Sequence, residues 1–181
     1  PIVKQLVEKM GGTITVESKL GEGSCFTVVI PFEIDTNAKP DGKKDFNEDI
    51  SGIRVLLAED NELNAEIAEF MLTESGAEVE TVNNGLEAVQ HFEASEPGTY
   101  DVILMDIMMP VMDGLTATRT IRALERQDAK TIPIIAITAN AFKEDAEKCI
   151  EAGMNAHIAK PLNDEKIKQT ISEELRRNGD S

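Results

Sequence analysis

Short apolar runs alternate with amphipathic stretches through most of the chain. The apolar runs are rich in Ile, Val, Leu and Ala, and their length and continuity are typical of strands that are buried on both faces. Between them, apolar residues recur with helical spacing. We therefore predict strands near residues 53–58, 77–82, 101–106, 132–137 and 155–159, and helices near residues 61–75, 84–95, 114–126, 143–152 and 163–176.

This strict alternation indicates one α/β domain. Repeated strand–helix units form a parallel sheet with right-handed crossovers and helices on both faces. Asn61 stands where an N-cap is expected, and Gly76, Gly153 and Gly179 follow three of the predicted helices. About 125 residues are too few for a closed (β/α)₈ barrel. We therefore expect a doubly wound, five-stranded parallel sheet over residues 52–178.

The first 35 residues form a separate unit. Apolar residues recur with helical spacing from Ile2 to Met10, and Gly11-Gly12 ends that helix. Strands are predicted at residues 13–16 and 26–32, joined by turn residues at 19–24. A helix followed by a hairpin is too small to bury a core of its own.

Residues 36–51 are predicted to be a linker. They are rich in Asn, Asp, Lys, Gly and Glu, and only Phe46 and Ile50 are large and apolar. The chain begins at Pro1, inside a predicted helix, so we expect it to be a piece of a longer protein.

Polar residues stand where four of the predicted strands end. In an open α/β sheet, ligands bind outside the carboxyl ends of the strands. Three carboxylates, one hydroxyl and one ammonium should therefore converge on one small surface. These residues are Glu59, Asp60, Asp106, Thr138 and Lys160.

The three carboxylates are candidate ligands for a small hard cation. Mg²⁺ prefers oxygen ligands in an octahedral arrangement, and crowded carboxylates repel one another unless a cation neutralises them. Acidic residues at the start of a helix also serve as caps, which alone would explain Asp60. It would not explain Glu59 and Asp106 beside it. The backbone carbonyl of Met108 is a further candidate ligand, whereas the Met108 side chain is interpreted as packing.

The other polar residues suggest phosphoryl chemistry. Asp106 directly follows a buried strand, where a carboxylate can act as a nucleophile toward phosphorus. Thr138 either closes its strand or donates a hydrogen bond to a phosphoryl oxygen. Lys160 precedes Pro161, which favours extended backbone and permits a cis peptide bond. From there its side chain can reach Asp106 or a phosphoryl group on it.

Composition excludes several classes of function. The 181 residues carry a formal net charge of −16, which disfavours nucleic acid and anionic membranes as partners and favours a cation or a basic surface. Two cysteines and two histidines without ligand spacing do not make a zinc site. Cys25 and Cys149 are expected to be free thiols in a reducing compartment. No apolar stretch is long enough to span a membrane, so we expect a cytoplasmic location.

Together these residues resemble the receiver domain of two-component response regulators. The resemblance covers residues 53–176 and implies a flavodoxin-like sheet with strand order 2-1-3-4-5. The matching stretches are Val55-Leu56-Leu57-Ala58-Glu59-Asp60-Asn61, residues 101–114, Ala136-Ile137-Thr138-Ala139 and Ala159-Lys160-Pro161.

The resemblance implies a role for each matching residue. It implies that Glu59 and Asp60 help to bind Mg²⁺ and that Asp106 accepts the phosphoryl group. Thr138 and Lys160 are expected to contact the phosphoryl oxygens. The family usually has an aromatic switch residue three positions before the lysine, where this chain has His157. In this chain the usual pair of switch residues, a threonine and an aromatic residue, is therefore not present in that form. Two interpretations are open: either His157 moves together with Thr138, or His157 only fills the outer face.

The first 35 residues resemble the end of a histidine-kinase ATP-binding domain. The matching stretches run from Ile2-Val3-Lys4 to Met10-Gly11-Gly12, then Val16-Glu17-Ser18, Gly21-Glu22-Gly23-Ser24 and Phe26. The nucleotide-binding motifs of that family are not among these residues, so ATP binding by this fragment is not expected. A kinase tail, a linker and a receiver suggest a hybrid sensor histidine kinase. Membrane anchoring of the parent protein is left open.

The function expected from the resemblance is Mg²⁺-dependent phosphoryl transfer from a phosphohistidine to Asp106. The phosphoryl group would then pass to a histidine phosphotransfer domain or regulate the attached kinase. The fragment would catalyse at most its own phosphorylation. One alternative is a degenerate receiver that serves only as an interaction module. A metal-dependent phosphatase would need a second acid near Asp106, where Met108 stands, and flavin binding is disfavoured by the low aromatic content.

Overall fold

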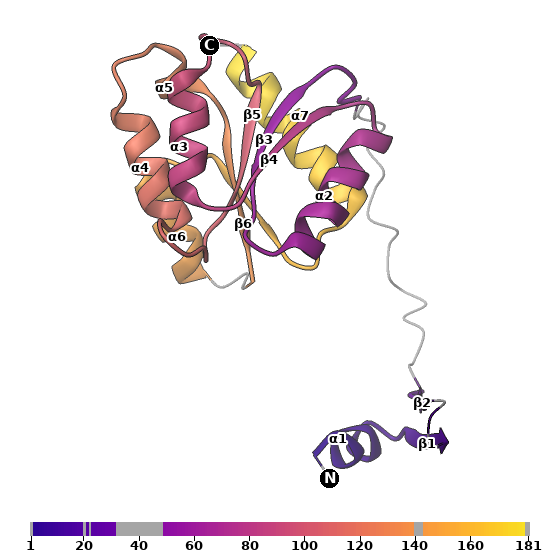
Figure 1. Cartoon of the computed structure of the whole chain (residues 1–181). Coiled ribbons are helices and arrows are strands. Elements are labelled where there is room, and N and C mark those ends of the chain that lie inside the picture. The colour runs from indigo at the N-terminus through magenta and orange to yellow at the C-terminus, as the bar shows by residue number, and fades with distance from the viewer. Residues whose placement is uncertain (1, 20, 22, 32–48, 140–142, 180–181) are drawn as a thin grey trace, which may run out of the picture. The chain divides into compact units, whose positions relative to one another are not determined.

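The computed structural model describes residues 2–19, 21, 23–31, 49–139 and 143–179 (Figure 1). The chain divides into two compact units, Pro1–Asp45 and Phe46–Ser181. This division falls within the stretch that was predicted to be a linker, of which residues 36–48 lie outside the described residues. Among the described residues, no helix is long and apolar enough to cross a membrane.

The first unit is a helix followed by a hairpin, as predicted. Helix α1 covers Ile2–Lys9, and strands β1 (Thr13–Lys19) and β2 (Gly23–Val29) pair antiparallel. Gly11 ends the helix with a φ of 72°. The strands continue closer to the turn than the prediction placed them, because the pairing extends to Lys19 opposite Gly23.

The second unit contains a five-stranded parallel sheet in the order β4-β3-β5-β6-β7. Counted within this unit, the order is 2-1-3-4-5, which confirms the predicted doubly wound topology. Each strand begins one or two residues after the position predicted for it. The strands are β3 (Arg54–Ala58), β4 (Glu78–Val82), β5 (Val102–Asp106), β6 (Ile134–Thr138) and β7 (Ala156–Ala159).

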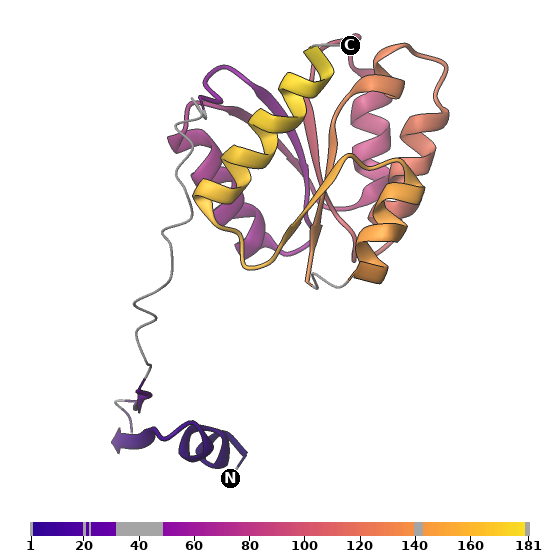
Figure 2. The same ribbon diagram turned by 180° about the vertical axis from the view of Figure 1, so that it is seen from behind.

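Helices cover both faces of this sheet (Figures 1 and 2). Helices α2 and α7 lie on one face, and α3, α4 and α6 lie on the other. Their bounds are α2 (Glu62–Glu74), α3 (Gly85–Ala94), α4 (Gly114–Ala123), α5 (Asp128–Thr131), α6 (Lys143–Ala152) and α7 (Asp164–Gly179). The prediction missed the short helix α5. It was also wrong about Gly179, which belongs to α7 and does not follow it.

Alternate strand residues form two apolar cores. Val55 and Leu57 of β3 belong to the core on the side of α2 and α7, whereas Leu56 and Ala58 belong to the core on the side of α3 and α4. All four are buried, which explains why the strands read as continuous apolar runs. Ile50, which lies in the predicted linker, is fully buried in the first of these cores, so the end of that stretch packs against the sheet domain.

The helix ends next to the sheet have the expected capping residues. The side chain of Asn61 accepts a hydrogen bond from Asn64 N, and Asp113 caps α4 through Thr116 N. Gly76 and Gly153 end α2 and α6 with φ values of 85° and 97°, where a side chain would be strained. The caps at Asn61 and Asp113 determine where α2 and α4 begin, after the loops that follow the carboxyl ends of β3 and β5.

Candidate functional site

The strand register brings the polar residues together. Ala58 pairs with Met105 across β3 and β5, so that Glu59 and Asp106 follow at the same level. Asp106 pairs with Ile137 of β6, and Thr138 pairs with Ala159 of β7. Lys160 follows Ala159 directly. The predicted convergence at the carboxyl edge of the sheet is therefore present.

Three carboxylates form a compact cluster at this edge. One oxygen from each of Glu59, Asp60 and Asp106 lies within 4.8 Å of the other two. Glu59 is only 2% exposed and Asp106 only 4% exposed, whereas Asp60 faces solvent. Negative charges this close and this buried require a positive partner. The donor set consists of hard oxygens with one open side, which fits Mg²⁺.

The ammonium of Lys160 lies between the two buried carboxylates. Its Nζ is 2.5 Å from Asp106 Oδ2 and 2.7 Å from Glu59 Oε2. Burial alone would lower the pKa of Lys160, but its contacts with Asp106 and Glu59 outweigh burial and raise that pKa. Lys160 is therefore held in its charged form. The Lys160–Pro161 peptide bond is cis, one of the two isomers that the sequence permitted.

The second oxygen of Glu59 has its own donors. Glu59 Oε1 accepts a hydrogen bond from Asn64 Nδ2 at 3.1 Å and a longer one from Asn61 N at 3.3 Å. Asn64 was not predicted from the sequence as a site residue. In the sequence, Asn64 is recognisable only as a polar residue in the first turn of a helix, and such residues are common.

The other predicted residues lie around Asp106. Asp106 Oδ1 accepts a hydrogen bond from Met108 N at 3.0 Å, while Met108 as a residue is 76% exposed. Thr138 is buried, and its carbonyl accepts a hydrogen bond from Lys160 N at 2.7 Å. The metal-binding role of the Met108 carbonyl stays a prediction, as does the phosphoryl contact of the Thr138 hydroxyl.

His157 lies on the edge strand β7 and is exposed. It pairs with Ala136, one residue before Ile137, which pairs with Asp106. His157 also lines a groove with Ile150 of α6. The predicted switch of Thr138 with His157 stays a prediction.

The loop after Asp106 packs tightly against the start of α4. Gly114 N donates a hydrogen bond to Ile107 O at 3.0 Å, and a Cβ at Gly114 would lie 2.1 Å from the backbone oxygen of Asp106. Only glycine permits this approach. The backbone that carries the Asp106 carboxylate is thus held by contact with α4.

Gly114→Ala is expected to lower the free energy of unfolding by about 3 kcal/mol, because the added methyl group must displace the backbone at Asp106. Gly52→Ala is the control, since Gly52 has a positive φ but a methyl group added there would meet nothing within 4 Å. It should lose only about 1–2 kcal/mol from backbone strain. Urea denaturation of both variants checks the difference, and equal losses would contradict a tight contact at Gly114.

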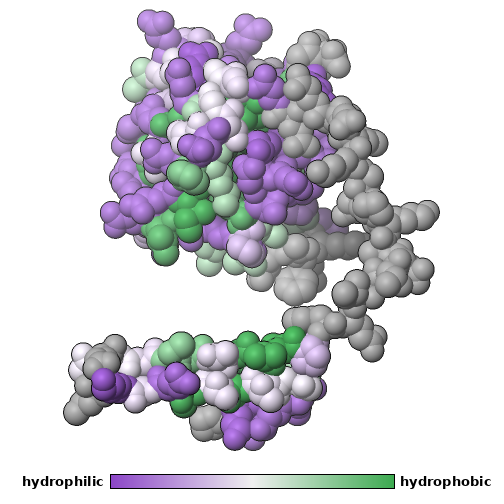
Figure 3. Space-filling view, turned by 90° about the vertical axis from the view of Figure 1, so that its right-hand side faces the viewer, coloured by the Kyte–Doolittle hydropathy of each residue, from purple (hydrophilic) through white to green (hydrophobic). Residues whose placement is uncertain are grey.

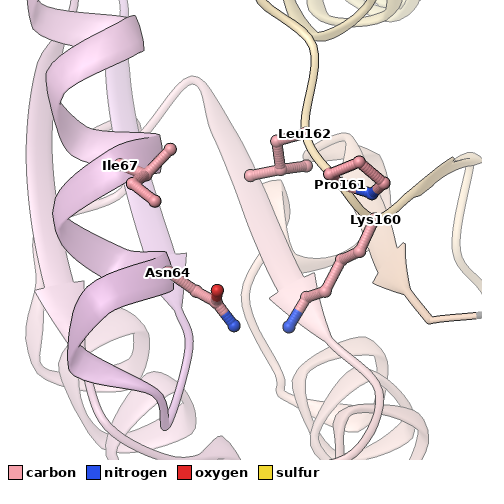
Figure 4. A pocket seen from close by; sticks show the side chains of 5 residues that line it. All are labelled: Asn64, Ile67, Lys160, Pro161 and Leu162. Carbon is pink, nitrogen blue, oxygen red and sulfur yellow. The ribbon is translucent and has the colours of Figure 1, made fainter. Parts of the chain in front are cut away.

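A small pocket adjoins the site (Figure 4). It is lined by Asn64 and Ile67 of α2 and by Lys160, Pro161 and Leu162. The amide of Asn64 and the ammonium of Lys160 point toward the same region at one end, while Ile67 and Leu162 form apolar walls above them. The pocket therefore joins the polar site to an apolar surface of α2.

Comparison with known proteins identifies the family to which the domain with this site belongs. The family model described as "Response regulator receiver domain" matches residues 55–172, which include the whole site. The chain belongs to the response regulator receiver domain family. Its second unit is thus a phosphoacceptor module of two-component signalling, and the resemblance seen in the sequence is confirmed.

Curated relatives of this receiver are named as sensor proteins or histidine kinases. The chain is 35% identical over 162 residues to the aerobic respiration control sensor protein ArcB of Escherichia coli, and the matched region covers 89% of this chain and 20% of ArcB. It is 38% identical over 151 residues to probable histidine kinase 1 of Oryza sativa, and this matched region covers 67% of this chain and 15% of that protein. The chain therefore spans a fifth or less of these two relatives.

Solved structures show the same fold. The receiver domain of a sensor histidine kinase from Pseudomonas aeruginosa is 41% identical, with a TM-score of 0.63 over 70% of this chain and 99% of that chain. That structure has a magnesium ion coordinated in its active site cleft. The receiver domain of a histidine kinase from Syntrophus aciditrophicus is 31% identical, with a TM-score of 0.61 over 70% of this chain and 92% of that chain.

Proposed function

We propose that Asp106 accepts a phosphoryl group from a phosphohistidine and that Mg²⁺ assists this transfer. The observation that carries the proposal is a nearly buried carboxylate in a cluster of three, with the Lys160 ammonium 2.5 Å from one of its oxygens. Glu59, Asp60, Asp106 and the Met108 carbonyl are the proposed ligands. Bound there, the cation would neutralise charge on the phosphoryl oxygens.

In the proposed reaction, a carboxylate oxygen of Asp106 forms a bond to phosphorus while the bond between phosphorus and the histidine nitrogen breaks. The histidine ring leaves with the electron pair of that bond. Lys160 and Thr138 bind the phosphoryl oxygens, and the backbone N–H of Met108 holds the Asp106 carboxylate in place. The protein contributes mainly orientation and charge stabilisation. The added charge then shifts the packing of the surrounding loops, with Thr138 and His157 as the proposed switch residues.

The donor and the next acceptor in the relay are proposed from the relatives. The two curated relatives described above are named as a histidine kinase and a sensor protein, and both are much longer than this chain. We therefore propose that the phosphohistidine domain of a kinase supplies the phosphoryl group. A histidine phosphotransfer protein would receive it, or the receiver would regulate the attached kinase. A degenerate receiver is disfavoured, because the acidic cluster and Lys160 are all in place.

We propose that residues 1–35 are the end of the ATP-binding domain of that kinase, that 36–51 are a linker, and that 52–178 are the receiver. In the first unit, large apolar residues such as Val16, Phe26 and Val29 are more than half exposed, as expected if this unit belongs to a larger sheet. Among the described residues, neither Cys25 nor Cys149 forms a disulfide bond, which favours a cytoplasmic location. The acidic surface favours neither nucleic acid nor membrane as a partner of this fragment.

An exposed apolar stripe on α2 supports a helical protein partner. Leu63, Ile67 and Phe70 are 64%, 42% and 65% exposed, and their spacing places them on one face of the helix. Figure 3 looks onto this side of the domain and shows hydrophobic surface among the polar surface. The stripe adjoins the pocket beside Lys160. A helix that carries the donor histidine could bind there by its own apolar face.

Phe70→Asp is therefore expected to slow transfer from a phosphorylated histidine domain at least tenfold, because it places a charge in the apolar contact. Ile150→Asp is the control, since Ile150 is 58% exposed on α6 and lies away from α2. Rapid-quench transfer assays with Mg²⁺ check both variants. Equal transfer by the two variants would place the partner surface elsewhere, and no transfer to the unaltered chain would contradict the proposed function.

A further inference from the structure

Asn64 is fixed by both its backbone and its side chain. Its backbone N donates a hydrogen bond to the side chain of Asn61, which caps α2. Its side-chain Nδ2 donates to Glu59 Oε1 at 3.1 Å. The cap therefore fixes the backbone position of Asn64, and this position places the Asn64 amide next to the Glu59 carboxylate.

The two carboxylate oxygens of Glu59 have different partners. The Lys160 ammonium lies 2.7 Å from Oε2 and attracts the carboxylate toward β7. On the other oxygen, the bond from Asn64 is shorter than the 3.3 Å bond from Asn61 N. Without the Asn64 amide, Oε1 would keep only the longer of these two bonds, and the carboxylate could turn toward Lys160.

We propose that Asn64 is a positioning residue, which holds the Glu59 carboxylate in the orientation required for Mg²⁺ binding. This inference rests on the proposed function, in which Glu59 is one of the metal ligands. Mg²⁺ tolerates little deviation from octahedral geometry, and groups that orient a ligand affect metal affinity strongly. Asn64 thus belongs to the site although it is not one of the proposed ligands.

The test is the affinity of the complete 181-residue chain for Mg²⁺, measured by isothermal titration calorimetry. Asn64→Leu removes the donor at similar volume, and Leu forms helices better than Asn, so that α2 should be retained. We expect the dissociation constant to rise about five- to tenfold. Asn64→Ala, which is smaller, should show the same rise. Circular dichroism in metal-free buffer confirms that both variants are folded.

The matched control is Thr73→Leu. The Thr73 hydroxyl donates to backbone oxygens of α2 itself, those of Glu69 and Phe70, at the far end of the helix from Glu59. This variant should bind Mg²⁺ like the unaltered chain. A second readout is the rate of phosphorylation by acetyl phosphate. In Asn64→Leu this rate should fall at low Mg²⁺ and recover at saturating Mg²⁺, whereas general damage to the fold would lower it at both.

Unchanged Mg²⁺ affinity in Asn64→Leu, beside an unaltered chain that does bind Mg²⁺, would overturn this inference and leave the proposed function intact. An unaltered chain that binds no Mg²⁺ would overturn both. A loss in Thr73→Leu equal to that in Asn64→Leu would also overturn the inference, because it would assign the effect to the helix as a whole.

Discussion

Asp106→Asn is expected to abolish phosphoryl acceptance completely while the fold is retained. Asparagine has nearly the same shape as aspartate, but its amide is not a nucleophile toward phosphorus. Asp106 lies at the end of β5 among fully buried apolar residues, so that an isosteric change disturbs little packing. Transfer from a phosphorylated histidine domain, followed by gel electrophoresis that separates phosphorylated protein, measures the loss.

The control for this experiment is Asp101→Asn. Asp101 precedes the same strand at its other end, where it accepts a hydrogen bond from Arg54 N. It should leave acceptance unchanged. Acceptance by Asp106→Asn at the rate of the unaltered chain would refute the site assignment, whatever the fold of the variant.

Lys160→Met is expected to make the stability of the domain depend on Mg²⁺. Methionine retains the length of the side chain but removes the ammonium from between Glu59 and Asp106, whose side chains are only 2% and 6% exposed. Two buried carboxylates then face each other without this cation. We expect the free energy of unfolding in EDTA to fall by about 2–4 kcal/mol. Added Mg²⁺ should restore part of that loss, and phosphoryl acceptance should fall at least a hundredfold.

Urea denaturation with EDTA and with Mg²⁺ checks this result. Lys168→Met is the matched control, because Lys168 forms an ion pair with Asp164 on the surface of α7 at the same 2.5 Å. A surface pair of this kind contributes less than about 1 kcal/mol. If Lys160→Met were as stable in EDTA as Lys168→Met, the ammonium would not be the charge that compensates the acidic cluster.

The main features of the site could be predicted from sequence because the fold is regular. Parallel strands bring their carboxyl ends to one edge, so that the order of apolar runs and polar residues was enough to place Glu59 next to Asp106. The contact of Lys160 with Asp106 also followed from this topology, once the strand carrying Ala159 was recognised, whereas its contact with Glu59 was not predicted.

Other features depend on contacts that have no signature in a single sequence. Asn64 resembles any polar residue in a first helical turn, and only its 3.1 Å bond to Glu59 reveals its place in the site. Gly114 can be identified as necessary only from its approach to Asp106. Helix α5 covers four residues, too few for a periodic pattern. Ile50 stands as an isolated apolar residue in a polar stretch, although it is fully buried.

Phosphorylation of Asp106 is tested most directly by the intact mass of the chain after incubation with acetyl phosphate, with Mg²⁺ and with EDTA, beside Asp106→Asn. We predict one added phosphoryl group on the unaltered chain with Mg²⁺, and none with EDTA or in the variant. Equal addition of a phosphoryl group to Asp106→Asn would contradict this prediction. So would the absence of any added phosphoryl group on a folded, unaltered chain that binds Mg²⁺ and is also offered a phosphorylated histidine domain.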